Sequence, residues 1–355
     1  MSAIVNEVWD TPAVVVDRLL AEANIDAFQS YCDSHQLAVR PHMKTHKLGY
    51  FARRQIAAGG VGITCQKIAE AEAMVAAGVD DILLTFNILG AAKLARLKAL
   101  AGRLNKLTLV ADNATVVAGL AATFNDPENA ISILVECDTG AQRCGVQTPQ
   151  QALALAQQIA AADGLHFAGI MTYPANGMAA QLATQLQLLI DTLAAAGLSC
   201  ETVSSGGTPD LWQAAEAPQV TEYRPGTYIY NDRSLVQYGT CSWEQCALRV
   251  VATVVSTPAP GRAIIDAGSK VLSSDLLGLP DYGYLPDYSH VSLYALSEEH
   301  GHLRWQGDEQ IFAVGQQIQI IPNHACVVSN LVGQIWLQID GQWQLQQVDA
   351  RGCCV

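Results

Sequence analysis

The chain has 355 residues, of which half are hydrophobic and 15% are charged, so it is long enough for a large buried core and a second, smaller domain. Its net charge of −13 argues against nucleic acid or an anionic membrane as a partner. No apolar run is long enough to span a bilayer. The start of the chain lacks a signal-peptide pattern and the ten cysteines lack framework spacing, which predicts a cytoplasmic protein with free thiols.

The N-terminal part of the chain predicts a short strand around Val5 and Trp9, a second strand over 13–16 and a helix from about Asp17. Apolar strands then recur, with Ala-rich helical stretches between them. We expect these strands at 37–44, 61–65, 81–86, 107–111, 131–137, 166–172, 200–204 and 219–223. The clearest helix is expected over 149–163, with Thr148 as its N-cap, Pro149 in its first turn and Gly164 as its stop.

Eight strand–helix units in succession predict an α/β fold, a (β/α)8 barrel of the TIM type. An open doubly wound sheet is the alternative, but no Gly-x-Gly-x-x-Gly follows any early strand. After about residue 240 the pattern changes to short strands with turn residues between them, at 248–257, 262–266, 290–296, 317–321 and 333–339. We therefore expect a barrel domain over residues 11–238 and a mostly β domain over 239–355, which residues 1–10 join.

The segment from Arg40 to Lys47 is unusually basic for a strand that enters a core. Residues two apart share a face of a strand, so a continued strand would bring four such groups to one surface: Arg40, His42, Lys44 and His46. One interpretation is a solvated basic strand end. The other is that Lys44 lies in a buried site whose cationic neighbours favour the neutral amine, which forms Schiff bases with carbonyl compounds.

A barrel of this kind carries its site at the C-terminal ends of the strands, with a phosphate site after strands seven and eight. Strand seven is followed by Ser-Ser-Gly-Gly-Thr at 204–208, and strand eight by Arg-Pro-Gly-Thr-Tyr at 224–228. Small residues let backbone N–H groups close around a phosphate. As a bare motif, Ser-Ser-Gly-Gly also fits an ordinary turn, but its place in the strand order favours phosphate.

Other strand ends supply the remaining groups of such a site. Lys44 lies at the end of strand one, Gln66 follows strand two, Arg143 follows strand five and Tyr173 follows strand six. A lysine, an aromatic ring, an arginine and a phosphate loop at one barrel rim suit pyridoxal phosphate, because the lysine carries the aldehyde and polar groups hold the ring.

A different pair of residues occurs far along the chain, in Pro-Asn-His-Ala-Cys at 322–326. In an extended segment His324 and Cys326 share a face, and a histidine with a thiolate favours zinc. Two protein ligands are too few for a structural site, so a bound ion would keep open positions for water or substrate. The alternative is a buried cysteine beside an unrelated histidine.

With these residues the chain resembles the metal-activated pyridoxal-phosphate enzymes of the D-serine dehydratase and D-threonine aldolase group, whose barrel is like that of alanine racemase. The resemblance covers nearly the whole chain. The motifs that carry it lie at 40–47, 64–67 with 70–72, 135–143, 205–208, 224–228, 266–270, 298–301 and 324–326.

The resemblance implies a role for each candidate residue. Lys44 is implied as the Schiff-base lysine, and His324 with Cys326 as ligands of Zn²⁺ or another divalent ion such as Mn²⁺. Further residues are implied around the cofactor, at its ring or its phosphate: Gln66, Arg143, Tyr173, Ser205, Gly206, Gly207, Thr208 and Tyr228. By analogy alone, barrels of the racemase type also imply a homodimer.

The resemblance also implies a reaction on D-3-hydroxy amino acids. Aldolase-type members carry Asp where Cys326 stands, so the cysteine favours dehydration of D-serine or D-3-hydroxyaspartate to a 2-oxo acid and ammonia. In this reaction Lys44 is the natural base at Cα, and the metal binds the leaving hydroxyl. Retro-aldol cleavage to glycine and an aldehyde is the alternative. A racemase, which needs a second base, and a non-catalytic pyridoxal-phosphate carrier, which needs only the barrel, are the other hypotheses.

Overall fold

The structure is a computed structural model that describes residues 8–355, so Val5 of the first expected strand lies outside the described residues. The chain forms two compact units. The barrel unit comprises Ala27–Lys44, Gly49–Gly226 and Cys353–Val355. The β unit comprises the described residues up to Asp26, together with Thr45–Leu48 and Thr227–Gly352.

The barrel unit contains an eight-stranded parallel sheet in the order β2-β9-β8-β7-β6-β5-β4-β3. Backbone hydrogen bonds also join its two ends, because Met43 N donates to Thr64 O (3.0 Å) and Thr64 N donates to Pro41 O (2.8 Å). All eight strands lie where the sequence predicts them, which confirms the barrel. Their bounds are β2 Ala38–Val39, β3 Ile63–Cys65, β4 Asp81–Leu84, β5 Lys106–Ala111, β6 Ile131–Cys137, β7 Leu165–Thr172, β8 Thr202–Ser205 and β9 Glu222–Tyr223.

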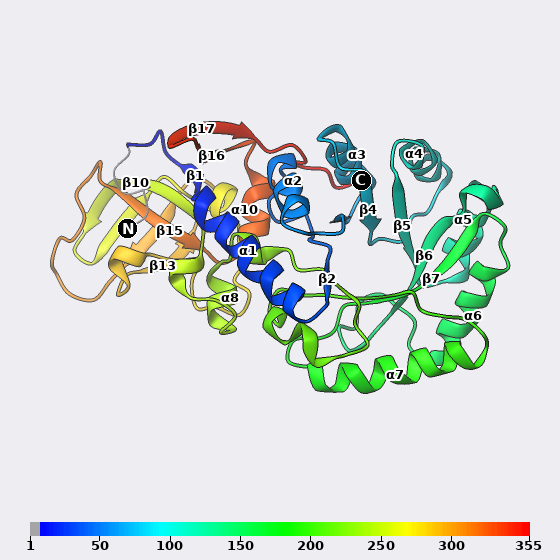
Figure 1. Cartoon of the computed structure of the whole chain (residues 1–355). Helices are drawn as coiled ribbons and strands as arrows, with labels where there is room; N and C mark the ends of the chain where they lie inside the picture. Colours follow the sequence, from blue (N-terminus) through cyan, green and yellow to red (C-terminus); the bar gives the residue numbers. More distant parts are fainter. Residues whose placement is uncertain (1–7) are drawn as a thin grey trace. The chain divides into compact units, whose positions relative to one another are not determined.

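Helices follow the strands of this sheet and cover its outer face (Figure 1). They are α2 Gly49–Ala57, α3 Ile68–Ala76, α4 Ala91–Ala101, α5 Ala114–Thr123, α6 Pro149–Ala160 and α7 Ala179–Ala195, with short 3₁₀ turns η2 Pro127–Asn129 and η3 Leu211–Glu216. The preceding helix α1, Arg18–Ser34, has its second half in this unit.

Helix α6 begins as predicted and ends earlier than predicted. The Thr148 side chain accepts a hydrogen bond from Gln151 N, and the Gln151 side chain accepts one from Thr148 N, which completes a capping box. The helix ends at Ala160 and not at Gly164. Gly164 serves a different purpose, because a Cβ at this position would overlap the carbonyl oxygen of Phe124.

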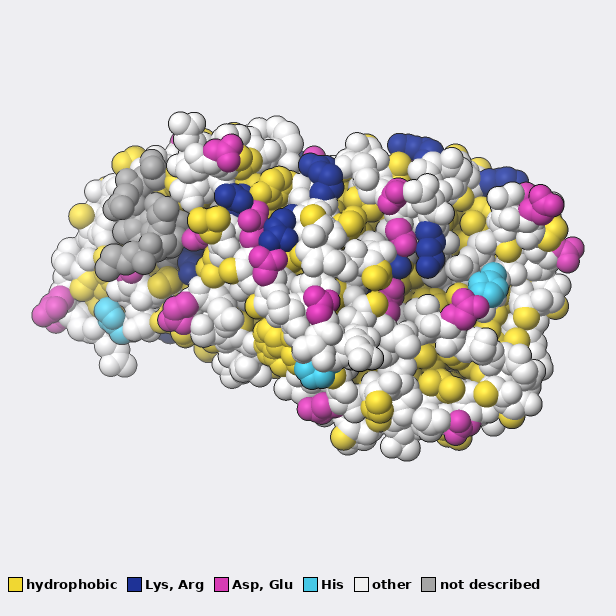
Figure 2. All heavy atoms as spheres, viewed as in Figure 1, with side chains coloured by type: hydrophobic (Ala, Val, Ile, Leu, Met, Phe, Trp, Pro, Cys, Tyr) yellow, Lys and Arg dark blue, Asp and Glu magenta, His cyan; other side chains and the backbone are white. Residues whose placement is uncertain are grey.

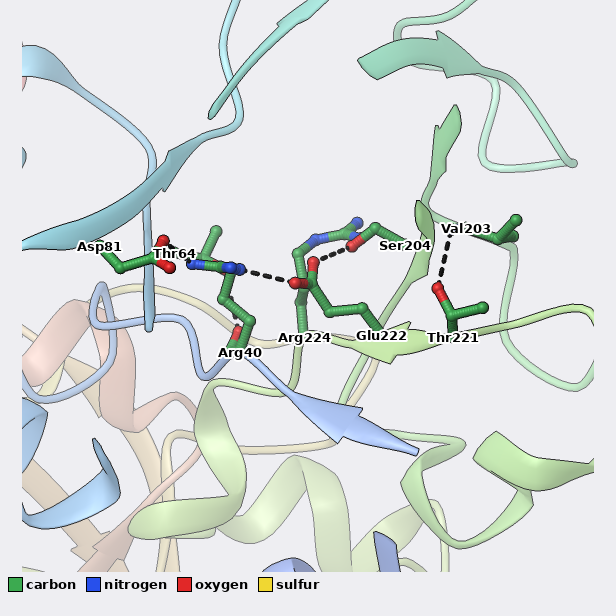
Figure 3. Close-up of polar contacts among 8 residues, drawn as sticks. All are labelled: Arg40, Thr64, Asp81, Val203, Ser204, Thr221, Glu222 and Arg224. Atoms are coloured by element: carbon green, nitrogen blue, oxygen red, sulfur yellow. Dashed lines mark hydrogen bonds and ion pairs between the residues drawn. The ribbon is translucent and has the colours of Figure 1, made fainter. Parts of the chain in front are cut away.

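The interior of the barrel is apolar in one layer and charged in another. Strands β4 to β7 contribute the buried apolar layer: Leu83, Val110, Leu134, Ala168 and Met171. A chain of ionic contacts also crosses the sheet (Figure 3). In it, Arg40 Nε donates to Glu222 Oε2 (2.7 Å) and Nη1 donates to Asp81 Oδ1 (2.6 Å). Such a group is stable in a core only because each charge faces an opposite one.

The described part of the β unit is built on nine strands. Its main path is β13-β14-β11-β10-β1-β16-β17, and β15 pairs with both β10 and β12. The strands expected at 13–16 and after residue 240 are present, whereas β12, β14 and β17 were not predicted. The bounds are β1 Ala13–Val16, β10 Leu248–Ala259, β11 Arg262–Ile265, β12 Gly283–Tyr284, β13 Ser292–Leu296, β14 Gly301–Arg304, β15 Gln317–Pro322, β16 Gln334–Ile339 and β17 Gln342–Gln347.

Strand β1 lies inside this sheet although it precedes the barrel in the chain. It pairs antiparallel with β10, with Ala13 opposite Val251, and parallel with β16. The ring of Trp9 packs edge-on against Trp336 and Trp343, over the buried side chain of Val251. Short helices complete the unit: α8 Arg233–Gln237, α9 Ser269–Leu272 and α10 Ala325–Leu331, with η4 Thr227–Ile229, η5 Trp243–Gln245 and η6 Pro286–Tyr288.

Basic and acidic side chains lie interspersed among apolar ones on the face drawn in Figure 2. Over the described part of the chain, no helix has both the length and the apolar composition that a membrane span requires.

Candidate active site

The basic segment after β2 leaves the sheet sooner than expected. Arg40 N donates to Tyr223 O (2.9 Å) and His42 N donates to Pro225 O (2.8 Å), so the extended backbone continues only as far as His42. Residues 43–46 then form a turn, in which Lys44 N lies 3.3 Å from His42 Nδ1. The prediction that Lys44 and His46 share a strand face with Arg40 is therefore wrong.

Lys44 lies half-buried at this turn, at the C-terminal side of the barrel strand. Within the described residues, its ammonium group makes no hydrogen bond or ion pair. A half-buried lysine without a carboxylate partner in the described part of the chain is a candidate for binding a carbonyl group.

Gln66 is held next to the same turn. Its Oε1 lies 3.2 Å from His42 Nε2, and its Nε2 donates to Thr85 O (2.9 Å). Its backbone N donates to the carboxylate of Glu70 (2.8 Å), which fixes the chain between β3 and α3. The Gln66 side chain therefore contacts His42, two residues before Lys44.

Arg143 and Tyr173 also lie together. The guanidinium carbon of Arg143 is 4.9 Å from the centroid of the Tyr173 ring, a cation–π contact. The same ring lies beside Gly207, where an added Cβ would be 3.7 Å from it. The loop after β6, the end of β7 and the loop after β8 therefore meet at Tyr173.

The loop after β8 has the features of a phosphate cradle. Gly206 cannot be replaced without a shift, because a Cβ there would lie 2.9 Å from the carbonyl oxygen of Arg224, and Gly207 has φ +129°. The loop is anchored by Thr208 Oγ1, which accepts from Gly226 N (3.1 Å). Ser205 Oγ is buried and has no hydrogen-bond partner among the described residues. A buried hydroxyl of this kind calls for an acceptor such as a phosphate oxygen, so these residues fit pyridoxal phosphate.

Two charged residues of this rim were not predicted as site residues. Arg224 is buried, and its guanidinium donates to Ser204 Oγ (2.6 Å) and to Thr172 O (2.8 Å). Burial lowers the pKa of Arg224 to about 10, although Glu222 and Glu136 oppose the shift. The motif at 224–228 contained this arginine. Only its contact with Thr172, the residue before Tyr173, reveals where its guanidinium lies.

Glu136 is the second such residue, at the end of β6. Burial and the neighbouring charge of Asp112 raise the pKa of Glu136 to about 6, although Arg143 and Arg224 oppose the shift. Donor atoms of Asp112, Glu136 and Cys144 all lie within 4.8 Å of one another. The position of Glu136 at a strand end was the available signal, because that is where barrel sites gather their residues.

The candidate metal ligands lie in the β unit, where β15 leads into α10. His324 is the extended N-cap residue of α10, and Cys326 lies in its first turn, so the expected extended segment ends one residue earlier. The Cys326 thiol nevertheless lies close enough to the imidazole to raise the pKa of His324. Cys326 Sγ also lies 3.1 Å from Thr45 Oγ1 and 3.3 Å from Thr227 Oγ1.

Carboxylates surround the imidazole of His324. Its Nδ1 lies 2.7 Å from Asp275 Oδ2, and the buried Asp232 accepts a hydrogen bond from the backbone of Ala325 (3.0 Å). Burial lowers the pKa of His324, but the hydrogen bonds to Cys326 and Asp275 and the charge of Asp232 outweigh it and raise the pKa to about 9. A cluster that stabilises positive charge on the ring, with a thiol beside it, fits a divalent cation.

Tyr228 was expected at the cofactor, and it lies in η4 of the β unit. It is buried and follows Thr227, the residue whose hydroxyl contacts Cys326. In the sequence Tyr228 therefore stands next to a residue that contacts a candidate metal ligand.

Known proteins share both parts of this chain. Residues 16–234 match the family model of the alanine racemase N-terminal domain, and residues 247–337 match that of a putative serine dehydratase domain. A D-threonine aldolase from Arthrobacter sp. is 34% identical over 97% of this chain and 93% of its own length. A D-threo-3-hydroxyaspartate dehydratase from Delftia sp. is 33% identical over 89% of this chain and 91% of its own length.

Solved structures agree with these sequence matches. The crystal structure of a D-threonine aldolase from Filomicrobium marinum superposes with a TM-score of 0.88 at 31% identity, covering 98% of this chain and 96% of its own. The Delftia dehydratase superposes with a TM-score of 0.86 at 30% identity, covering 96% and 97%. That dehydratase was also solved with alanine in place of a histidine, and with alanine in place of a cysteine two residues further on, the latter in a metal-free form.

The matches span almost the whole chain, at identities that establish kinship, and they join the barrel to the β unit in one architecture. The chain therefore belongs to the alanine racemase-like family of pyridoxal-phosphate-dependent lyases that includes the D-threonine aldolases and the serine dehydratases.

Proposed function

We propose that this protein is a pyridoxal-phosphate- and metal-dependent lyase that dehydrates a D-3-hydroxy amino acid, D-serine or D-3-hydroxyaspartate, to a 2-oxo acid and ammonia. The observation that carries the proposal is that His324 and Cys326 lie together at the start of α10, with His324 Nδ1 2.7 Å from Asp275 Oδ2 and Cys326 Sγ 3.1 Å from Thr45 Oγ1. The Delftia dehydratase has a histidine and a cysteine at the same spacing, and its variant with alanine for that cysteine was solved in a metal-free form. The matching pair in this chain is thereby the candidate ligand pair.

The barrel residues hold the cofactor in this proposal. Pyridoxal phosphate supplies an electron sink that makes the Cα proton of a bound amino acid acidic. Lys44, which makes no ion pair among the described residues, would hold the cofactor aldehyde, and its amine would be the group that takes the Cα proton of a bound substrate. Ser205 and the backbone of Gly206, Gly207 and Thr208 hold the phosphate.

The remaining rim residues orient the cofactor ring. Tyr173 lies against Arg143 and beside Gly207, so it contacts two loops. Gln66 is fixed by Thr85 and Glu70 and reaches the lysine segment through His42. We propose that these side chains hold the polar groups of the ring.

The β unit holds the ion in this proposal. His324 and Cys326 ligate Zn²⁺ or another divalent ion such as Mn²⁺, which supplies a Lewis acid for the β-hydroxyl of the substrate. Two protein ligands leave positions for water and substrate. Overall, the substrate loses its Cα proton and its hydroxyl as water, and water then replaces the nitrogen, so ammonia and a 2-oxo acid are the products.

Retro-aldol cleavage to glycine and an aldehyde is the second candidate, because the relative at 34% identity and the solved structure with a TM-score of 0.88 are both D-threonine aldolases. Cys326 argues against it. A racemase is less favoured, because the likeness to a solved alanine racemase (15% identity, TM-score 0.67) shows only the fold and the His324–Cys326 pair would have no task.

We also propose that the protein acts as a homodimer in the cytoplasm.

The test is a product analysis with D-serine, D-threonine and D-3-hydroxyaspartate. Ammonia and a 2-oxo acid in equal amounts are expected from D-serine or D-3-hydroxyaspartate. Glycine and an aldehyde without 2-oxo acid would establish the aldolase instead, and L-serine as the only product would establish a racemase.

A second experiment tests the cofactor lysine. Borohydride reduction of the yellow protein should fix the cofactor to the peptide that contains Lys44. Lys270 is a matched control, because it is exposed and ion-paired with Glu299 (2.6 Å), so Lys270→Ala should label normally and Lys44→Ala should not label. A label on Lys47 or Lys270 in the wild-type chain would overturn the assignment.

A further inference from the structure

We propose that Asp275 is a positioning residue of the metal site, which holds the ring of His324 so that Nε2 is the ligating nitrogen and thereby strengthens metal binding. This inference rests on the proposed function, because it takes His324 and Cys326 as the ligands. It assigns a role to a residue that no motif of the chain contains.

The contact itself is direct. Asp275 Oδ2 lies 2.7 Å from His324 Nδ1, and the two residues are 49 positions apart in the sequence. A histidine ligand binds an ion through one ring nitrogen only. A carboxylate on the other nitrogen fixes the tautomer and the ring orientation and makes the ligating nitrogen a better donor. With Nδ1 engaged by Asp275, the nitrogen left for an ion is Nε2.

The backbone carbonyl of Asp275 is bound by Asn323, the residue next to His324. Asn323, the residue before His324, is buried, and its Nδ2 donates to Asp275 O (3.1 Å) and to Asp281 O (2.7 Å). Both the carbonyl and the carboxylate of Asp275 are therefore bound by consecutive residues, Asn323 and His324. This double attachment is what a loop needs if it is to keep a carboxylate at a fixed place beside a ring.

The loop also adopts an unfavourable backbone conformation. Ser273 has φ +66°, a region that residues with a side chain rarely adopt, and its hydroxyl accepts a hydrogen bond from Asp275 N (3.0 Å). Two residues after this turn, the Asp275 carboxylate lies against the ring of His324. Strained residues persist where surrounding contacts over-determine them, and here those contacts converge on Asp275.

A second carboxylate near His324 has a different task. Asp232 is buried and binds backbone and hydroxyl groups, namely Ala325 N, Leu235 N and Ser234 Oγ, so it fixes the start of α10 rather than the imidazole ring. Asp275 is half-exposed and binds the ring itself. Removing the charge of Asp275 should therefore change metal affinity while the fold stays intact.

The experiment measures Zn²⁺ affinity on the full chain loaded with cofactor and stripped of metal by chelation, by competition with a chromophoric chelator. We expect Asp275→Asn to weaken Zn²⁺ binding by about 10–100-fold, the range typical for the loss of such a partner. Because every backbone contact of Asp275 survives in this variant, the cofactor absorbance and the melting temperature of the metal-free protein should stay unchanged. Asp308→Asn, which removes the charge of an exposed carboxylate in the same unit, is the matched control and should bind as the wild type does.

The outcomes separate this inference from the function on which it rests. If Asp275→Asn binds Zn²⁺ within twofold of the wild type while His324→Ala loses binding, the site stands and the role of Asp275 is refuted. If Asp308→Asn weakens binding as much as Asp275→Asn does, the effect is a general one of charge and the positioning role is also refuted. If the wild type binds no Zn²⁺, or His324→Ala binds it normally, the proposed metal site itself is wrong, and the role of Asp275 falls with it.

Discussion

Replacing Arg40 by methionine should destabilise the barrel more than any other single charge removal at its sheet. Arg40 is only 4% exposed and binds Glu222, which is 6% exposed, through Nε. Glu222 also accepts a hydrogen bond from Ser204 Oγ, which in turn accepts one from Arg224 (Figure 3). Methionine keeps the unbranched stem of arginine but leaves the Glu222 carboxylate buried without its cation.

The magnitude follows from this burial. Removing one partner of a buried ion pair costs about 3–5 kcal/mol, because the other charge stays behind uncompensated. The Asp81 side chain, the second partner of Arg40, is 24% exposed and can be hydrated, so Asp81→Asn should cost no more than about 1 kcal/mol. For a domain of this size, about 2–4 °C of melting temperature corresponds to 1 kcal/mol, so Arg40→Met should melt roughly 6–20 °C lower.

The assay is thermal unfolding of wild type, Arg40→Met, Glu222→Leu and the double variant. The double variant should be less destabilised than the sum of the two single variants, by more than about 1 kcal/mol, because neither charge is then left alone. The reasoning is refuted if Arg40→Met melts within about 3 °C of the wild type, or if the two substitutions are additive.

Three further predictions concern a glycine, a carboxylate and the metal. Gly169 has φ +134°, and a Cβ there would overlap the Thr202 carbonyl oxygen, so Gly169→Ala should melt far below the wild type. Gly177→Ala, at φ +77° with nothing within 4 Å, is the control and should cost about 1–2 kcal/mol. Burial raises the pKa of Glu136 from 4.5 to about 6. The wild type should therefore lose about 2 kcal/mol of unfolding free energy relative to Glu136→Gln as the pH rises through this window. Parallel urea titrations of both proteins at pH 4 and pH 7 measure this loss. If the two proteins differ in unfolding free energy by the same amount at both pH values, the raised pKa of the buried Glu136 carboxyl is refuted. Chelation should abolish turnover but keep the bound-cofactor absorbance, and added Zn²⁺ should restore activity. The His324→Ala variant should behave like the chelated enzyme even at saturating substrate. Normal turnover of D-serine without metal would rule out metal assistance.

The barrel strands were predictable because parallel strands are buried on both faces and read as continuous apolar runs. Strand β6, with its sequence Ile-Ser-Ile-Leu-Val-Glu-Cys, was predicted with the bounds that the structure shows. Strand β17 was missed because it is the outermost strand of its path, Gln342–Gln347, and mostly exposed, so its four glutamines look like a loop. Its pairing with β16 is a property of the sheet and not of the segment.

Some residues of the candidate site could likewise be predicted from the sequence, and others could not. Lys44, Gln66 and Tyr173 could be found because each follows a barrel strand, and a barrel gathers its strand ends at one rim. The bend that takes Lys44 out of the strand could not be found, since the hydrogen bond at this point joins Met43 to a residue distant in the sequence, Thr64. Asp275 was missed for a similar reason, because it lies in an irregular loop and only tertiary contacts bring it to His324.

Cys326 contacts Thr45, a residue that is adjacent to Lys44 in the sequence. Thr45 directly follows Lys44 in the sequence, and its Oγ1 lies 3.1 Å from Cys326 Sγ. Hydrogen bonds from hydroxyl groups stabilise a thiolate, which is the form that binds a metal. The contact is made by Thr45 and not by the Lys44 side chain. Cofactor binding and metal binding are therefore separable by substitution. Lys44→Ala should lose the covalent cofactor and keep Zn²⁺, His324→Ala should do the reverse, and only the intact pair should turn over a D-3-hydroxy amino acid.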